Sequence, residues 1–470
     1  MRDDSAGPPK LRPFWGLALA NTLSNITIPL ASLTDVAVLG RLPEPAPLAA
    51  VALAGVIFDY LLWSLAFLRM GVTSETARAW GAGNGLQLRD TLRDHLILAA
   101  GFGLLMLACA PWILALGEYA LTPATSLIGD LRGYFYARIL GAPFALTNFV
   151  ILGWLLGLGH SRAALVLAVL GNGLNAVLDI VLVLHWGQGA AGAGYATAAG
   201  QAAITVSGAL YITHLFVQRR LPPAVPRRAD ANAHSRDQRH TRAAARVPGA
   251  LLLRLGSTLR RLLRLLAFHR DLFVRTLVLI TAFALLVRLS ASMSVLALAA
   301  TSLWLRVYSF VSFLSDGAAH ALETYAGVLW ACGEHAALRA RVRQVLRVAF
   351  LISLVALLAL STAPTFWIGL LTTQAELTAP TLALLPGLLL TLLFGAPAWV
   401  YDGLFLGTGQ ARVLRNAMLF AFAAFASVAA IAYVQRSPLG LWFALAALMG
   451  GRSLALAYAW HVQARTAAGA

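Results

Sequence analysis

Gly153–Arg162 reads GWLLGLGHSR, and 250 positions later Gly403–Arg412 reads GLFLGTGQAR. Both phrases combine an apolar run, three glycines at the same spacing and a closing arginine. A second phrase is repeated 246 positions on, so that Phe67, Leu68, Gly71 and Gly81 return as Phe313, Leu314, Gly317 and Gly327. Because the two offsets nearly agree, the sequence predicts two related halves within one chain.

The composition indicates that lipid surrounds most of the chain. Of the 470 residues, 59% are hydrophobic and 12% are charged, and the mean hydropathy is +0.75. Soluble domains carry about 25% charged residues. Apolar runs of 20 or more residues indicate membrane spans, whose backbone groups must be satisfied within the segment, as in a helix. We therefore predict an all-α membrane protein.

Twelve spans are predicted, six in each half. Their approximate limits are 13–40, 48–76, 92–116, 127–158, 163–184 and 189–217, then 272–293, 295–330, 344–371, 377–408, 413–435 and 439–463. The corresponding domains are a tail (1–12), an N-terminal bundle (13–217), a linker (218–271), a C-terminal bundle (272–463) and a second tail (464–470). The two bundles are predicted to be pseudo-symmetric.

The basic residues predict the orientation of the chain. The tails, the linker and the loops on their side of the membrane contain 27 of the 36 basic residues, whereas the opposite loops contain only Arg41, Arg132 and Arg436. Positively charged loops favour the cytoplasm, so both termini should be cytoplasmic. The net charge of +17 is then explained by topology, and we expect no nucleic-acid partner.

The linker is unusually rich in arginine. Residues 218–270 contain thirteen arginines, and the polar, Pro-rich part is predicted to be disordered. From about residue 250 to 268 the arginines fall on one helical face and the leucines on the other. This pattern predicts an amphipathic helix on anionic lipid headgroups, with an ordinary solvated connector as the alternative.

An even number of spans per half makes the halves run in the same direction through the membrane. The repeated phrase then marks the cytoplasmic end of the fourth span in each bundle, where glycines permit close helix contact. Two such bundles facing a central cavity are typical of an alternating-access transporter.

Polar residues within spans normally face a cavity because they are costly in lipid. In the N-terminal half they form stripes on the first, fifth and sixth spans: Asn21, Asn25, Ser32 and Asp35, then Asn172, Asn175 and Asp179, then Thr197 and Gln201. Pro29 interrupts the first span and is a candidate hinge. The C-terminal half contributes Asp316, Glu323 and Asp402, which could instead pair with Arg288 or Arg306.

Six stretches resemble the multidrug and toxic compound extrusion (MATE) transporters, and specifically their DinF-like bacterial branch. They are PLASLTDVAVLGRL, AFLRMGVTSETARAWGAGN, NGLNAVLDIVL, GAAGAGYATAAGQ, FLSDGAAHALETYAG and YDGLFLGTGQARVLRNAM, within about residues 14–460. The resemblance implies a V-shaped pair of six-helix lobes and export of drugs in exchange for protons or sodium. It also places the family's N-lobe cation site at Asp35, Asn175, Asp179 and Thr197.

These observations predict a monomeric antiporter in a bacterial inner membrane, with organic, cationic or amphipathic compounds as substrates. Asp35 and Asp179 would share a dry pocket in which two close carboxylates cannot both ionise readily. Proton uptake would then let the first span repack at Pro29 and displace the substrate. H⁺ is the expected coupling ion and Na⁺ the alternative, with no cofactor and no other metal.

Two other classes of function are less well supported by the sequence. A flippase for a lipid-linked precursor would share the bundles and the cavity, and the arginine-rich linker could bind headgroups. Against it, such proteins usually have more than twelve spans. No nucleophile elbow, phosphate loop or His/Asp metal cluster is apparent in the sequence, so an enzyme is not expected.

Overall fold

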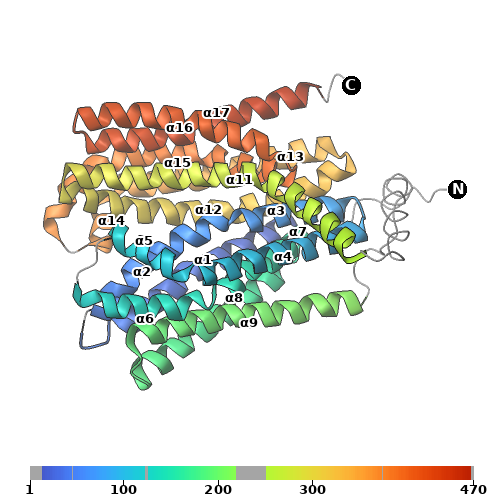
Figure 1. Cartoon of the computed structure of the whole chain (residues 1–470). Helices are drawn as coiled ribbons and strands as arrows, with labels where there is room; N and C mark the ends of the chain where they lie inside the picture. The colour runs from blue at the N-terminus through green and yellow to red at the C-terminus, as the bar shows by residue number, and fades with distance from the viewer. Residues whose placement is uncertain (1–12, 45, 122–124, 219–249, 373, 467–470) are drawn as a thin grey trace. The chain divides into compact units, whose positions relative to one another are not determined.

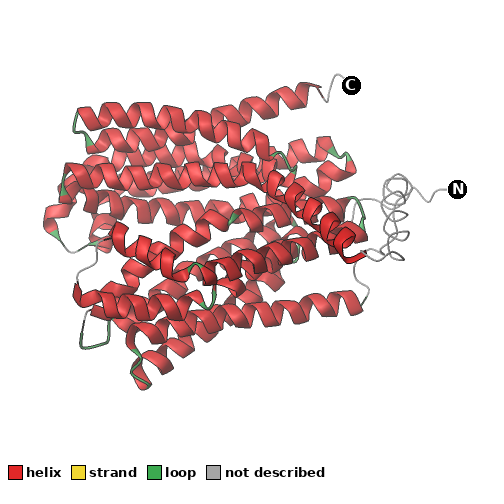
Figure 2. Cartoon of the chain, viewed as in Figure 1, coloured by secondary structure: helices red, strands yellow, loops and turns green. Residues whose placement is uncertain are grey.

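The apolar segments fold into helices in the computed structural model. It describes residues 13–44, 46–121, 125–218, 250–372 and 374–466, without the side chains of residues 28–33, 36, 250–268 and 464–466. Every element in these ranges is helical, and none of them contains a strand (Figure 2). The prediction of an all-α protein is confirmed.

The helices of the N-terminal half position the candidate site, and Figure 1 shows their arrangement. They are α1 (Phe14–Leu39), α2 (Ala46–Leu65), α3 (Phe67–Gly81), α4 (Gly85–Ala108), α5 (Ala110–Leu121), the 3₁₀ turn η1 (Thr125–Leu127), α6 (Ile128–Ile139), α7 (Ala142–Gly157), α8 (Ser161–Asp179) and α9 (Gly189–Val217). A π-helix, η2 (Ile180–His185), continues α8 directly after Asp179.

The C-terminal half begins with the longest helix in the described residues. Its elements are α11 (Ala250–Met293), α12 (Val295–Cys332), α13 (His335–Thr362), α14 (Pro364–Leu371), the 3₁₀ turn η3 (Ala375–Leu377), α15 (Thr378–Gly407), α16 (Ala411–Val434) and α17 (Pro438–Thr466). Residues 250–268 and the seventh predicted span form one continuous helix, not two. Their side chains up to residue 268 lie outside the described part, so binding of this segment to lipid stays a prediction.

Several predicted spans are interrupted in the structure. The second span breaks at Ala66 into α2 and α3, and the third breaks at Cys109 into α4 and α5. In the fourth, α6 and α7 meet at an angle of 46°. In the described residues, ten helices are long and apolar enough to cross a membrane, or eleven when this bent pair counts as one span. That number does not include α1, so the count of twelve stays a prediction.

Contacts divide the chain into two units. Residues 26–270 belong to the first unit, and residues 11–25 and 271–470 belong to the second. The division differs from the predicted domains, because the start of α1 groups with the second unit and the start of α11 groups with the first. Each half of the chain therefore contributes the beginning of its first long helix to the other unit.

A pair of equivalent glycines makes room for one side chain from each of these two helix segments. In the first unit, an added Cβ on Gly71 would lie 1.8 Å from Cε1 of His269, in the part of α11 that belongs to this unit. In the second unit, the equivalent Gly317 would meet Oγ1 of Thr22, in α1, also at 1.8 Å. Equivalent glycines of the two halves thus contact the first long helix of the opposite half, α11 at Gly71 and α1 at Gly317.

The glycines of the repeated phrase have two structural roles. The first two pack against the backbone of another helix: an added Cβ would lie 2.7 Å from Thr73 O for Gly157, and 2.2 Å from Glu323 O for Gly407. The third glycine has a positive φ in both halves, +75° at Gly159 and +77° at Gly409. Each of them ends its helix in the left-handed conformation that glycine adopts without steric cost.

We expect Gly407→Ala to loosen the packing of α15 against α12. The new methyl group would overlap a backbone oxygen of α12 that cannot rotate away, and overpacking of this kind costs about 1–3 kcal/mol. The midpoint of thermal unfolding of the purified protein in detergent should fall. Gly369→Ala in α14 is the matched control, since nothing lies within 4 Å of its added Cβ. Equal midpoints for the two variants would contradict the close-packing role.

Candidate functional site

The first unit places Asp35 of α1 directly against Asp179, the last residue of α8. Their carboxyl groups lie within reach of a shared hydrogen bond. Asp179 is 0% exposed, and no N–H or O–H group of the described residues donates to either of its oxygens or to Oδ1 of Asp35. Carboxylates only accept hydrogen bonds, so a bond between the two requires a proton on one of them. The arrangement suits a group that takes up and releases a proton.

Arg138 of α6 supplies the positive charge nearest to this pair among the described residues. It acts electrostatically on Asp35, donates a hydrogen bond of 2.8 Å to the Tyr134 hydroxyl and lies 4.4 Å from the centre of the Phe58 ring. Asp59 of α2 also interacts electrostatically with Arg138, so the guanidinium acts on this carboxylate as well as on the pair. Arg138 was not predicted as a site residue from the sequence, although a charged residue inside an apolar span is a signal for function.

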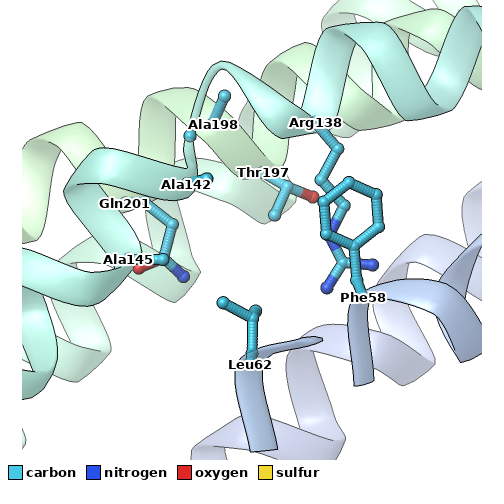
Figure 3. A pocket seen from close by; sticks show the side chains of 9 residues that line it. Phe58, Leu62, Arg138, Ala142, Ala145, Thr197, Ala198 and Gln201 are labelled. Carbon is cyan, nitrogen blue, oxygen red and sulfur yellow. The ribbon is translucent and has the colours of Figure 1, made fainter. Parts of the chain in front are cut away.

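A small cavity lies beside Arg138 and Thr197 (Figure 3). Its volume is about 30 Å³, room for a water molecule or two. Phe58 and Leu62 of α2 face Thr197 and Gln201 of α9 across it. The Thr197 hydroxyl donates to the carbonyl oxygen of Ala193 at 3.0 Å, which leaves its lone pairs available to a ligand.

Asn175 and Asn172 have different surroundings although they lie on the same helix. Asn175 is 6% exposed, and no described group accepts from its Nδ2. Asn172 donates to the hydroxyl of Thr27 at 3.0 Å and so ties α8 to α1. Asn175 is therefore a buried amide with spare hydrogen-bonding capacity, whereas Asn172 holds two helices together.

Gln201 takes part in a hydrogen-bond chain that the sequence analysis did not foresee. Nδ2 of Asn148 in α7 donates to Oε1 of Gln201 at 2.7 Å, and the Thr205 hydroxyl donates to Oδ1 of Asn148 at 2.8 Å. This chain fixes the amide of Gln201 at the wall of the cavity.

The other predicted site residues of α1 either belong to the second unit or have side chains outside the described part. Asn21, which is buried, and Asn25 belong to the second unit, whereas Asp35 belongs to the first, so the predicted stripe on α1 is divided between units. The side chains of Pro29 and Ser32 lie outside the described part of the chain. The hinge at Pro29 and a cavity role for Ser32 stay predictions.

The carboxylates of the C-terminal half have partners within the second unit. Asp402 is hydrogen-bonded to Arg275 of α11 and to Arg452 of α17. Asp402 was predicted to line a substrate cavity, with an ion pair to Arg288 or Arg306 as the alternative. It does form ion pairs, but with two other arginines, because α15 packs against α17 and carries Asp402 to Arg452. Asp316 accepts from the Ser312 hydroxyl at 3.5 Å, and Glu323 lies 3.8 Å from Nδ1 of His320.

Comparison with known proteins identifies the family. The MatE family model matches residues 21–181 and 272–433, one match in each half of the chain. The chain belongs to the MatE family. MatE proteins are multi-pass membrane transporters and not enzymes, so the expectation that the chain is not an enzyme is confirmed. The duplicated match corresponds to the two halves marked by the repeated phrases.

One relative and one solved structure match nearly the full length of the chain, and a second relative matches part of it. DNA damage-inducible protein F of Escherichia coli K12 is 31% identical over 455 residues, which are 96% of this chain and 92% of that protein. Multidrug resistance protein PmpM of Pseudomonas aeruginosa is 29% identical over 194 residues, 40% of each chain. A solved MATE transporter in an outward-facing conformation shares the MatE fold with a TM-score of 0.77 and 20% identity, covering 97% of this chain and 95% of that one.

Proposed function

We propose that this MatE protein exports organic compounds, cationic or amphipathic, in exchange for protons. The observation that supports it best is the buried carboxyl pair of Asp35 and Asp179, which needs a proton for direct contact. A known relative named a multidrug resistance protein supports the substrate class. The protein would lie in a bacterial inner membrane as a monomer, with both termini cytoplasmic.

The transport cycle follows from competition between proton and substrate. A proton entering from outside neutralises one carboxylate, and α1 repacks at Pro29 so that the substrate cavity of the N-terminal bundle narrows. The substrate is displaced outward because it binds the deprotonated state better. Return to the inward-facing state releases the proton into the cytoplasm.

Sodium is the competing coupling ion. Asn175, Thr197 and the two carboxylates offer the oxygen ligands that a hard cation prefers. Purified protein in liposomes, with the proton and sodium gradients imposed separately, distinguishes the two. We expect a proton gradient alone to drive accumulation of a fluorescent organic cation such as ethidium, and a sodium gradient alone to leave it at the level of protein-free liposomes.

The same liposomes can carry a fluorescent lipid to test for flippase activity. Translocation of the lipid without movement of the organic cation would replace the proposed function with the flippase. If a sodium gradient alone drives transport of the organic cation, the proposed export function stands and only the coupling ion is changed to Na⁺.

A further inference from the structure

The first unit contains a second group of ionisable side chains, one half-buried and two buried, that the proposed transport cycle does not use. Glu75 of α3, His95 of α4 and His269 of α11 each offer one ligand atom, and these atoms lie within 4.8 Å of one another. His95 is 0% exposed and His269 is 1% exposed. In the predicted topology the cluster lies towards the cytoplasmic end of the unit, where α3 turns into α4.

The hydrogen bonds of His95 determine which of its nitrogens carries a hydrogen. Nδ1 lies 2.7 Å from the carbonyl oxygen of Thr91, which can only accept. Nδ1 therefore carries the hydrogen, and in the neutral ring Nε2 presents a lone pair to the cluster. A histidine whose Nδ1–H is bound by a backbone carbonyl while Nε2 stays available is the usual arrangement of a metal ligand.

The other two side chains complete a ligand set for a divalent metal. Nε2 of His269 lies 2.9 Å from Nε2 of His95, a distance that without a metal requires a shared hydrogen. A cation bound by both rings would replace that hydrogen, with the Glu75 carboxylate as the third ligand. Two histidines and a glutamate with a water in the fourth position form a known zinc coordination.

The observed separations allow this coordination with small side-chain rotations. Zinc with nitrogen and oxygen ligands at about 2.0–2.1 Å places its ligand atoms roughly 3.3 Å apart in a tetrahedron. The present separations, from 2.9 Å up to 4.8 Å, bracket that value. Arg78 and Asp94 also act electrostatically on Glu75, but with opposite signs.

Gly71 holds the position of His269 without being a ligand. An added Cβ there would lie 1.8 Å from Cε1 and 2.5 Å from Nδ1 of the imidazole, so the ring occupies space that only a glycine leaves. The ring centre of Phe67 lies 5.5 Å away on the same side of α3. Packing therefore positions this imidazole before any metal binds.

The ligand set is particular to the first half of the repeat. At the offset of 246 residues, Glu75 corresponds to Ala321 and His95 to Arg341. Thr22, and not a histidine, fills the place at Gly317 that His269 fills at Gly71. Conservation of the repeated fold thus does not explain why three potential ligands meet at this one position.

We propose that Glu75, His95 and His269 bind one divalent transition-metal ion, with Zn²⁺ preferred. The bound ion fastens the start of α11, where the arginine-rich segment ends, to α3 and α4 of the first unit. This site is separate from the carboxyl pair and does not depend on the proposed transport function.

The wild-type protein provides the first test. The full chain is purified in detergent with a tag free of histidine, stripped with a chelator and titrated with Co²⁺. We expect one equivalent of Co²⁺ to produce the visible absorption of a four-coordinate site, Zn²⁺ to displace it, and Zn²⁺ to raise the midpoint of thermal unfolding. Absence of stoichiometric Co²⁺ binding overturns the proposal. Because this experiment uses the wild-type protein, a folding defect of a variant cannot affect its result.

Variants then locate the metal. Glu75→Gln, His95→Ala and Gly71→Ala should each weaken Co²⁺ binding by at least about tenfold, the last by displacing His269 while leaving every ligand in the chain. Gly101→Ala in α4, His185→Ala and the Cys109→Ser/Cys332→Ser double variant should bind as the wild type does. Unchanged binding by a folded His95→Ala/His269→Ala variant would place the metal elsewhere and overturn the assignment.

Discussion

The Asp35→Asn variant is expected to lose proton-driven efflux almost completely, by tenfold or more in everted membrane vesicles, while its expression is unchanged. The amide can donate a hydrogen bond to Asp179, which the native carboxylate cannot do without a proton. Asp179 then keeps its negative charge, and neutralisation no longer accompanies the transport step. Efflux is measured as quenching or release of a fluorescent organic cation after a proton gradient is formed.

Two further variants test whether the carboxyl groups act as one unit. Asp179→Asn should cause the same loss, and the Asp35→Asn/Asp179→Asn double variant should be no worse than either single one, since residues that act together are not additive. Glu44→Gln is the control, because Glu44 is an exposed carboxylate of the same unit. Efflux by Asp35→Asn equal to that of the wild type would remove Asp35 from the mechanism.

Much of this site could be predicted because its signals lie within single helices. The repeated glycine phrases indicated two halves, and polar residues inside apolar spans identified Asp35 and Asp179, which the structure brings together. The break at Ala66 carries no proline, so a hydropathy pattern could not locate it, whereas the break at Cys109 lies two residues before Pro111.

Contacts between side chains of helices far apart in the sequence could not be predicted in this way. His95 and His269 are 174 positions apart, and no local spacing connects them. Arg288 and Arg306 were named as alternative partners of Asp402 because they lie in apolar sequence, and only the packing of α15 with α17 selects Arg452. The residue types were visible in the sequence, but their neighbours depended on the fold.

The second large effect is expected from Asp402→Asn, which should destabilise the second unit. Asp402, Arg275 and Arg452 are 8%, 5% and 3% exposed, so the two guanidinium groups depend on this carboxylate for charge compensation. Asp316 also acts electrostatically on Arg275. The two arginines and two aspartates sum to zero charge, and Asp402→Asn leaves one positive charge unbalanced. Because Asp402 is committed to this network, it offers no free charge to a substrate.

Removing one partner of a buried ion pair costs about 3–5 kcal/mol, so the free energy of unfolding should fall by that amount. The measurement is denaturant or thermal unfolding of the purified protein in detergent. Glu118→Gln is the matched control, since Glu118 pairs with Arg132 at 2.7 Å on the surface, with 20% and 54% of their side chains exposed. An exposed ion pair contributes about 0–1 kcal/mol to the free energy of unfolding, so Glu118→Gln should change it little.

A quadruple variant separates charge from packing as the cause of this loss. Replacing Arg275, Asp402 and Arg452 by Met, Leu and Met, together with Asp316→Asn, removes all four charges of the network and keeps apolar volume, which is often neutral or stabilising for a buried ion cluster. We therefore expect the quadruple variant to recover most of the stability that Asp402→Asn loses. If Asp402→Asn is as mild as Glu118→Gln, the two arginines must be compensated without Asp402, and its role as their counter-charge is wrong.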